Sequence, residues 1–320
     1  MPLVRLLAVF CALLMSVAAT AQTYPTRPVR MVIGFTPGGG VDINARLLAS
    51  RLSEILGQSV VVENRPGAGT NIASELVAKA PADGHTLLMN TGAIAINMSL
   101  YKSPGYDTLR DFSPVSIFSE SQNILTVSAA KPYRNVGELI AAARAKPGAL
   151  TYGSAGAGST QHLAGELFKL RTGTDILHVP YKGSAPALTA LIAGEIDMVL
   201  INVPAIIGQV KSGRLRPLAA AGNRRSEQLA DVPTLREAGV NGVESTVWYG
   251  VLAPAATPRD IIATLASAIG RAARAPETRQ RLTDQGAEAV GSTPDEFAAI
   301  LREDVARWRD VVRAAGVKPE

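Results

Sequence analysis

The sequence predicts an α/β fold with mostly parallel sheets, arranged as two domains. Short apolar runs of β-type residues alternate with segments whose apolar residues recur at helical spacing, which is typical of a parallel sheet covered by helices. Near Val115–Ala129 two apolar β-type runs follow each other, and Val247–Ala253 resumes the first sheet. We therefore expect a second domain (127–222) inserted into the first (22–126 and 223–320).

The first domain is expected to alternate strands and helices from its start. Val29–Phe35 is strand-like, and Asp42–Leu56 carries apolar residues at helical spacing before a stop at Gly57. Two long amphipathic helices, at Ile261–Ala273 and Pro294–Ala314, close the protein. The remaining elements are a strand at Val60–Glu63, a loop at 64–70, a helix around Asn71–Lys79, a turn at 81–84 and a strand at Thr86–Asn90.

The inserted domain begins with a helix at Val136–Ala145, for which Asn135 is a cap and Glu138 stands at the capping-box position. Since the chain crosses between the domains twice, they can close over a ligand about a hinge. The other elements are strands at Leu150–Gly153, Ile176–Val179 and Met198–Ile201, helices at Thr160–Leu170 and Ala185–Ile192, and a run at Leu215–Ala221 that leads back out.

The N-terminus has the features of a secretory signal. Arg5 precedes the apolar run Leu6–Val17, and Ala19-Thr20-Ala21 is a cleavage-site pattern. We expect residues 1–21 to be removed after export. The apolar run is also too short to anchor the protein in a membrane. The only cysteine, Cys11, leaves with the signal. The mature chain is therefore not expected to hold a disulfide, a cysteine-ligated metal or a cysteine nucleophile.

The charge pattern argues against nucleic acid as a partner. The net charge of +5 is dispersed along the chain, and only 5% of the residues are aromatic. A nucleic-acid surface needs clustered basic residues and aromatic side chains for stacking. The three histidines lie on separate predicted elements and make no metal-ligand pair by their spacing. We expect a monomer without a metal or cofactor.

Two glycine-rich turns, at 37–42 and 154–160, are each placed after a predicted strand and before a predicted helix. The free N–H groups of a helix N-terminus and the helix dipole favour a negative charge. Two such turns facing each other across a cleft would form a receptor for a small carboxylate. The alternative is that the glycines only allow tight turns.

The mature sequence resembles the Bug-type periplasmic solute-binding proteins of the tripartite tricarboxylate transporter family. The order and spacing of the shared motifs over nearly the whole mature chain carry this resemblance. The motifs are Tyr24-Pro25-x-x-Pro28, Gly34–Asp42, Val62–Gly69, Pro81–Leu88, Tyr152–Ser159 followed by His162-Leu163-Ala164, His178–Gly183, Asp231–Thr234 with Glu237-Ala238-Gly239, and Trp248-Tyr249-Gly250 with Ala253-Pro254.

The resemblance implies a type II periplasmic-binding-protein fold, the two-lobed Venus flytrap, and a periplasmic location. It implies capture of a dicarboxylate or aromatic acid and its delivery to membrane transporter subunits. In this family main-chain amides, small hydroxyl side chains and waters typically hold the carboxylate. Three positions depart from the pattern, and one of them, His85 in place of a common tyrosine, is expected to have no functional meaning. Thr70 stands where the family often has glycine, and Ile201 replaces a common aspartate, which puts a polar contact there in doubt.

The candidate ligand-binding residues come from the turns and from neighbouring strand ends, where N–H groups and hydroxyls can donate to a carboxylate. Asp42 fits the first turn of a helix better than contact with an anion, which it would repel. His162 fits a bond that holds its loop, and Thr91 fits either a ligand contact or a helix cap. The full set is Phe35, Gly39, Gly40, Asp42, Thr91, Ser154, Gly158, Ser159, Thr160, His162 and Asn202.

Two other functions were weighed against transport. An exported hydrolase would need a nucleophile elbow, but Tyr152 occupies the position of its first glycine, and a Ser159–His162 pair lacks an evident acid partner. The chain also contains neither a phosphate-binding loop motif nor H-E-x-x-H. We therefore do not expect an enzyme. A sensor that presents its ligand-bound lobes to a membrane signalling protein would have a similar binding site, so the sequence leaves that alternative open.

Overall fold

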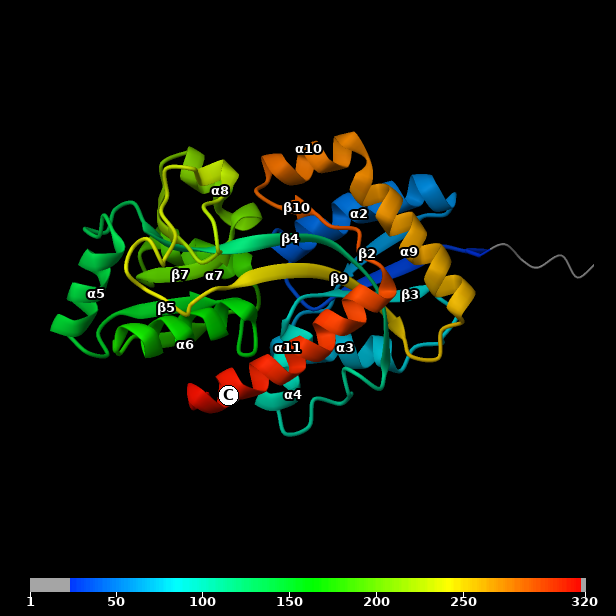
Figure 1. The fold of residues 1–320 in the computed structure, drawn as a ribbon, viewed down its shortest axis with the longest axis horizontal. Helices are drawn as coiled ribbons and strands as arrows, with labels where there is room; N and C mark the ends of the chain where they lie inside the picture. The colour runs from blue at the N-terminus through cyan, green and yellow to red at the C-terminus, as the bar shows by residue number, and fades with distance from the viewer. Residues whose placement is uncertain (1–23, 318–320) are drawn as a thin grey trace, which may run out of the picture.

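The computed structural model describes residues 24–317, which form a curled mixed sheet covered by helices (Figure 1). The predicted α/β class is confirmed. The two outer groups of strands are parallel, and the two strands in the middle, β9 and β4, run antiparallel to their neighbours. In spatial order the strands are β2 (Val60–Asn64), β1 (Val29–Ile33), β3 (Thr86–Asn90), β9 (Thr246–Pro254), β4 (Phe112–Ser128), β7 (Met198–Asn202), β5 (Thr151–Ser154) and β6 (Leu177–Pro180).

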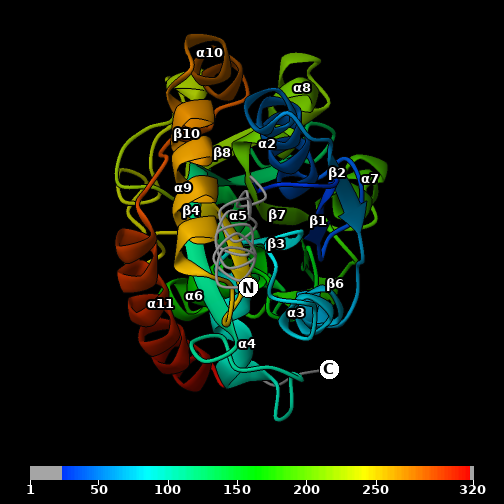
Figure 2. The ribbon, with the colours of Figure 1, turned by 90° about the vertical axis from the view of Figure 1, so that its right-hand side faces the viewer.

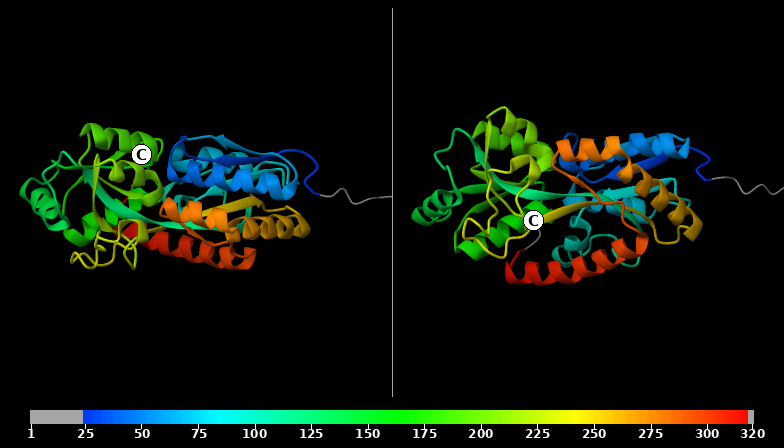
Figure 3. Two further views of the ribbon diagram at one scale, coloured as in Figure 1. Left: turned by 90° about the horizontal axis from the view of Figure 1, so that it is seen from above. Right: turned by 45° about the horizontal axis from the view of Figure 1, so that its top comes forward.

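Strand β4 joins the two lobes. Its first part, as far as Gln122, pairs with β9 and with β10 (Glu288–Ala289), whereas Asn123 and the residues after it pair with β7 and β8 (Leu215–Ala220). The two β-type runs predicted near 115–129 are thus one strand, about 55 Å long at the usual rise per residue. Figure 3 shows from two further directions that the lobes lie side by side along the long axis.

The strand pairing places the two crossings between lobes at Gln122/Asn123 and at Ser245/Thr246. The segment between β8 and β9 packs on the second lobe: Thr234 bridges to Ala220, and Leu229 belongs to the apolar cluster of that lobe. The boundaries expected from sequence, after residues 126 and 222, remain predictions.

Helices cover both faces of the sheet in the first lobe (Figure 2). Successive side chains of β1 point to opposite faces, so Met31 and Ile33 pack in one apolar cluster and Val32 packs in another. The first cluster includes residues of α2 (Gly40–Leu56) and α9 (Arg259–Arg274), and α10 (Pro276–Asp284) follows α9. The second cluster includes residues of α3 (Asn71–Ala78), α4 (Ala93–Leu100) and α11 (Pro294–Ala314).

The second lobe carries four helices, which are α5 (Val136–Ala145), α6 (Thr160–Thr172), α7 (Ser184–Ala193) and α8 (Val203–Lys211). The predicted cap of α5 is confirmed: the Asn135 side chain accepts a hydrogen bond from the Glu138 N–H at 2.9 Å. Helices α4 and α8 were not predicted. Both begin within three residues of the end of a buried strand, and α4 is apolar on nearly all sides.

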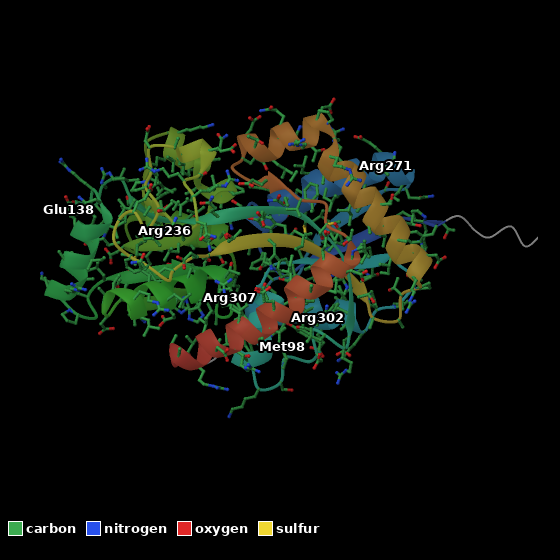
Figure 4. All side chains as sticks on the ribbon, in the orientation of Figure 1. Met98, Glu138, Arg236, Arg271, Arg302 and Arg307 are labelled. Atoms are coloured by element: carbon green, nitrogen blue, oxygen red, sulfur yellow. The ribbon has the colours of Figure 1, made fainter. Side chains whose placement is uncertain are left out.

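Helix α11 fixes the C-terminal part of the chain to the strands that join the lobes. Asp304 accepts a hydrogen bond from Trp248 Nε1 of β9 at 2.7 Å, and Arg307 donates to the Glu244 carbonyl at 3.1 Å. Figure 4 shows Arg302 and Arg307 on this helix. No helix among residues 24–317 is both long and apolar enough to cross a membrane.

Phe297 of α11 gives a test of this packing. The ring is fully buried and meets the Trp248 ring edge-on at 5.0 Å. Phe297→Ala should lower the free energy of unfolding by about 3–5 kcal/mol, because it removes a buried ring and leaves a cavity. Ile300→Ala, at a position 36% exposed on the same helix, should change it by less than about 0.5 kcal/mol. Urea unfolding followed by circular dichroism measures both; equal losses would contradict the assignment.

Candidate functional site

The first glycine turn leads from β1 into α2 without a side-chain cap on the helix. Gly39 is the N-cap residue, and no side chain bonds to the N–H groups that begin this helix. Asp42, in the first turn, is held by its own lobe: its carboxylate accepts from the Gly38 N–H, from Arg46 and from Asn64 at about 3.0 Å. Burial raises the pKa of Asp42, but these hydrogen bonds and the Arg46 charge outweigh it and lower the pKa.

The start of α2 faces the starts of two helices of the other lobe. A Cβ atom placed on Gly39 would lie 3.4 Å from Ser184 Cβ, and one placed on Gly40 would overlap Asn202 Oδ1. Ser184 opens α7 and Asn202 is the N-cap residue of α8; neither helix has a side-chain cap. Three uncapped helix N-termini therefore meet at the boundary between the lobes.

Several polar atoms are buried beside these helix starts. Thr36 Oγ1, Asn202 Oδ1 and Tyr249 Oη lack a hydrogen-bond partner within residues 24–317. Burial raises the pKa of Tyr249, which keeps its hydroxyl neutral and able to donate. Since buried polar groups are normally paired, these atoms and the helix N–H groups together mark a place suited to a small polar ligand.

The hydroxyl groups of the second glycine turn hold its own loop. Ser159 caps α6, where its Oγ accepts from the His162 N–H at 3.2 Å. Ser154 Oγ accepts from the Gly156 N–H at 3.1 Å and lies 2.7 Å from His178 Nε2. Thr160, also buried, approaches the first lobe, with Cγ2 3.2 Å from where a Cβ on Gly92 would lie.

A stack of two histidine rings supports this turn from inside the second lobe. His162 and His178 lie parallel with ring centroids 4.0 Å apart, and Tyr152 stacks on the far side of His178. His162 Nδ1 accepts from the Gly158 N–H at 3.2 Å, so this nitrogen is unprotonated. Burial lowers the pKa of His162 to about 4 and that of His178 to about 3. Both rings are neutral at pH 7.

The second turn contacts helix α4 and the loop at residues 64–70 of the first lobe, which we call the third loop. Tyr101 Oη donates to the Ala157 carbonyl at 3.4 Å, and a Cβ on Gly158 would overlap Asn97 Oδ1. A cavity of about 230 Å³ opens here between the lobes. It is lined by Gly34, Tyr101 and residues 67–70 from the first lobe, and by residues 155–157 and 180–182 from the second.

The two glycine turns do not face each other as expected, and the cavity is lined by residues 155–157 of the second turn but by none of residues 37–42. The first turn meets Ser184 and Asn202, whereas the second meets the third loop and α4. They are linked through Ala155, which packs in the same apolar cluster as Phe35.

Of the candidates, Gly39, Gly40 and Asn202 lie together at the helix starts, and Phe35 lies just before them, while Ser154, Gly158, Ser159, Thr160 and His162 form the second turn. Thr91 accepts from the Ala93 N–H at 3.3 Å, at the start of α4. Their contacts with a ligand remain predictions. Thr36, Ser184 and Tyr249 also lie at the helix starts but were not among the candidates; for Ser184, a signal was its place after Gly183 at a strand-to-helix turn.

Comparison with known proteins gives the family. The model of the tripartite tricarboxylate transporter family receptor matches residues 44–317. This chain belongs to that family. It is similar to R. palustris Rpa4515, solved with adipate, at 41% identity and TM-score 0.90, covering 93% of this chain and 100% of that one.

Two further solved structures show the same fold. The periplasmic binding protein BugD is 31% identical, with TM-score 0.89 and coverage of 93% of this chain and 100% of that one. MatC from Rhodopseudomonas palustris, with bound malate, is 32% identical, with TM-score 0.87 and coverage of 90% and 100%. The expected Bug-type family and two-lobed binding-protein fold are confirmed. The family is one of solute-binding receptors.

The histidine stack predicts loss of stability in mild acid. Both folded-state pKa values lie below the unfolded value of about 6.5, so the unfolded chain binds more protons between pH 6.5 and pH 4. The free energy of unfolding should therefore decrease as the pH is lowered through that window, by at most about 1.4 kcal/mol per pH unit for each histidine.

Urea midpoints measured from pH 8 to pH 5, above the range in which most carboxylates titrate, test this dependence. The double variant His162→Asn/His178→Gln keeps a hydrogen-bonding atom near each nitrogen but cannot titrate. Its stability should be nearly flat across the same range. A slope equal to that of the wild type would show that the stack is not the source.

Proposed function

We propose that this protein is a periplasmic receptor that captures a small dicarboxylate or aromatic acid between its lobes and delivers it to a membrane transporter. The observation that carries the proposal is the meeting of the uncapped N-termini of α2, α7 and α8, which come from opposite lobes. Helix N-termini offer N–H donors and a favourable dipole to an anion. All three N-termini can contact one ligand only when the two lobes lie close together.

The lining of the cleft favours a carboxylate over a sugar or a cation. Asp42, the acid closest to the helix starts, is neutralised by Arg46, so it does not oppose a bound anion. Lys182 adds a positive charge at the edge of the cavity between the lobes. The adipate and malate in two related structures are dicarboxylates, which makes that class the first to test.

Export and delivery complete the proposal. The signal-like segment at residues 1–21, with cleavage expected after Ala21, lies outside the described residues. A ligand that binds the closed lobes better than the open ones shifts the population towards the closed form, which a membrane transporter can distinguish by its surface.

Binding without conversion of the ligand is the chemistry proposed for this cleft. Ser159 Oγ is used to cap α6, and the low pKa of His162 and His178 makes them weak general bases at pH 7. The cleft should return its ligand unchanged, which chromatography of the released acid would verify.

Thermal unfolding in the presence of candidate ligands tests the proposed class. Adipate and malate are the first probes, followed by other mono-, di- and tricarboxylates and aromatic acids. A bound acid at a hundredfold excess over its Kd adds about 2.7 kcal/mol and should raise Tm by several degrees. Adipamide, which has the shape of adipate without its charges, should give no shift. A panel in which only neutral compounds stabilise the protein would refute the proposal.

Gly40→Ala should weaken carboxylate binding at least tenfold while the fold is retained. The added methyl group would overlap Asn202 Oδ1 and lie 3.0 Å from Tyr249 Oη, so the lobes could not approach as they do here. Gly208→Ala is the matched control, because its Cβ would meet nothing within 4 Å. Calorimetric titration with an acid identified in the thermal screen compares the two variants. Unchanged affinity in Gly40→Ala would exclude this cleft.

A further inference from the structure

A second cavity spans the two lobes at the strands that join them. It has a volume of about 430 Å³ and shares no lining residue with the cavity beside the second glycine turn. Its walls are residues 120–122 and Thr246 of the joining strands, residues 222–224 and 226–228 packed on the second lobe, and Thr283 and residues 286–288 of the first lobe. The lobes also touch beside it, where a Cβ on Gly286 would overlap Val203 of α8.

The charges on this cavity are unbalanced. Its lining holds three carboxylates, those of Glu120, Glu227 and Glu288, and one guanidinium, that of Arg224. Arg224 is already paired with both Glu288 and Glu227. The Glu120 carboxylate is half-buried and makes no hydrogen bond or ion pair within the described part of the chain, although the Arg224 charge attracts it from a greater distance. A half-buried carboxylate without a partner is costly, and a cation would relieve that cost.

One uncharged side chain points to a ligand independently of the carboxylates. Ser226 is 6% exposed and lines the cavity, and its hydroxyl has no hydrogen-bond partner among residues 24–317. Gln122 Oε1 is instead buried against Gly222 and is not open to the cavity. The cavity thus offers an unused hydroxyl as well as the Glu120 carboxylate, and an ammonium group, which has three donors and no acceptor, complements that set.

We propose that this cavity is a second binding site, distinct from the carboxylate cleft, for a small organic cation with one or more ammonium groups. Glu120 pairs with the ammonium, and the Ser226 hydroxyl accepts one of its remaining hydrogen bonds. A volume of about 430 Å³ suits a small organic molecule rather than a bare ion. No group of three or more metal-ligating residues is found in the described part of the chain.

Calorimetric titration of the mature protein with 1,4-diaminobutane, a diammonium at pH 7.5, tests the site. Saturable one-to-one binding is expected, and 1,4-butanediol at the same concentrations should not bind. Absence of saturable binding of the diammonium up to tens of millimolar would overturn the proposal, as would equal binding of the diol.

Three variants locate the binding. Glu120→Gln keeps the shape and removes the charge, and should weaken the diammonium at least tenfold; Ser226→Ala should weaken it several-fold. Glu303→Gln, which alters an exposed carboxylate on α11 outside the cavity, should leave the affinity unchanged. Glu120→Gln with wild-type affinity, or an equal loss in Glu303→Gln, would refute the assignment.

The carboxylate cleft is controlled separately. Adipate at a saturating concentration should not displace the diammonium, because the two cavities share no lining residue. Competitive displacement of the diammonium by adipate would overturn the separate site.

Discussion

The continuous hydrogen bonding of β4 determines the architecture. This strand exchanges partners from β9 and β10 to β7 and β8 between Gln122 and Asn123, so one uninterrupted backbone belongs to both sheets. The parallel strands of each lobe then end on the cleft, and the helices that follow them begin there. The helix N-termini of the proposed site are a consequence of this topology, since open α/β sheets bind ligands beyond the carboxyl ends of their strands.

The alternation of strands and helices was predictable because hydrophobic periodicity is a local property. The cap of α5 by Asn135 and the long helix α11 were predicted for the same reason. Helix α4 was missed because its sequence is apolar on nearly all sides and shows no helical face. The continuity of β4 was missed because Ser119 and Ser121 break its apolar pattern, although both side chains are buried and hydrogen-bonded.

The site was predictable in its parts but not in its pairing. Glycine turns before helices indicated where N–H groups would be available, and Asn202 was found at a strand end. The contacts between the turns of one lobe and those of the other depend on how the lobes are placed. That placement depends on the point at which β4 changes its pairing partners. Ser184 follows a glycine at a strand-to-helix turn, but only the tertiary structure brings it and Tyr249 to Gly39 and Gly40.

The capping pattern of the helices has a consequence for how the receptor can diversify. α2, α7 and α8 present main-chain groups to the cleft, whereas α6 is closed by Ser159. Main-chain donors are encoded by the fold and persist when neighbouring side chains mutate. If the proposed site is correct, substitutions around these donors would change which acid is preferred and leave the anion-binding groups themselves in place.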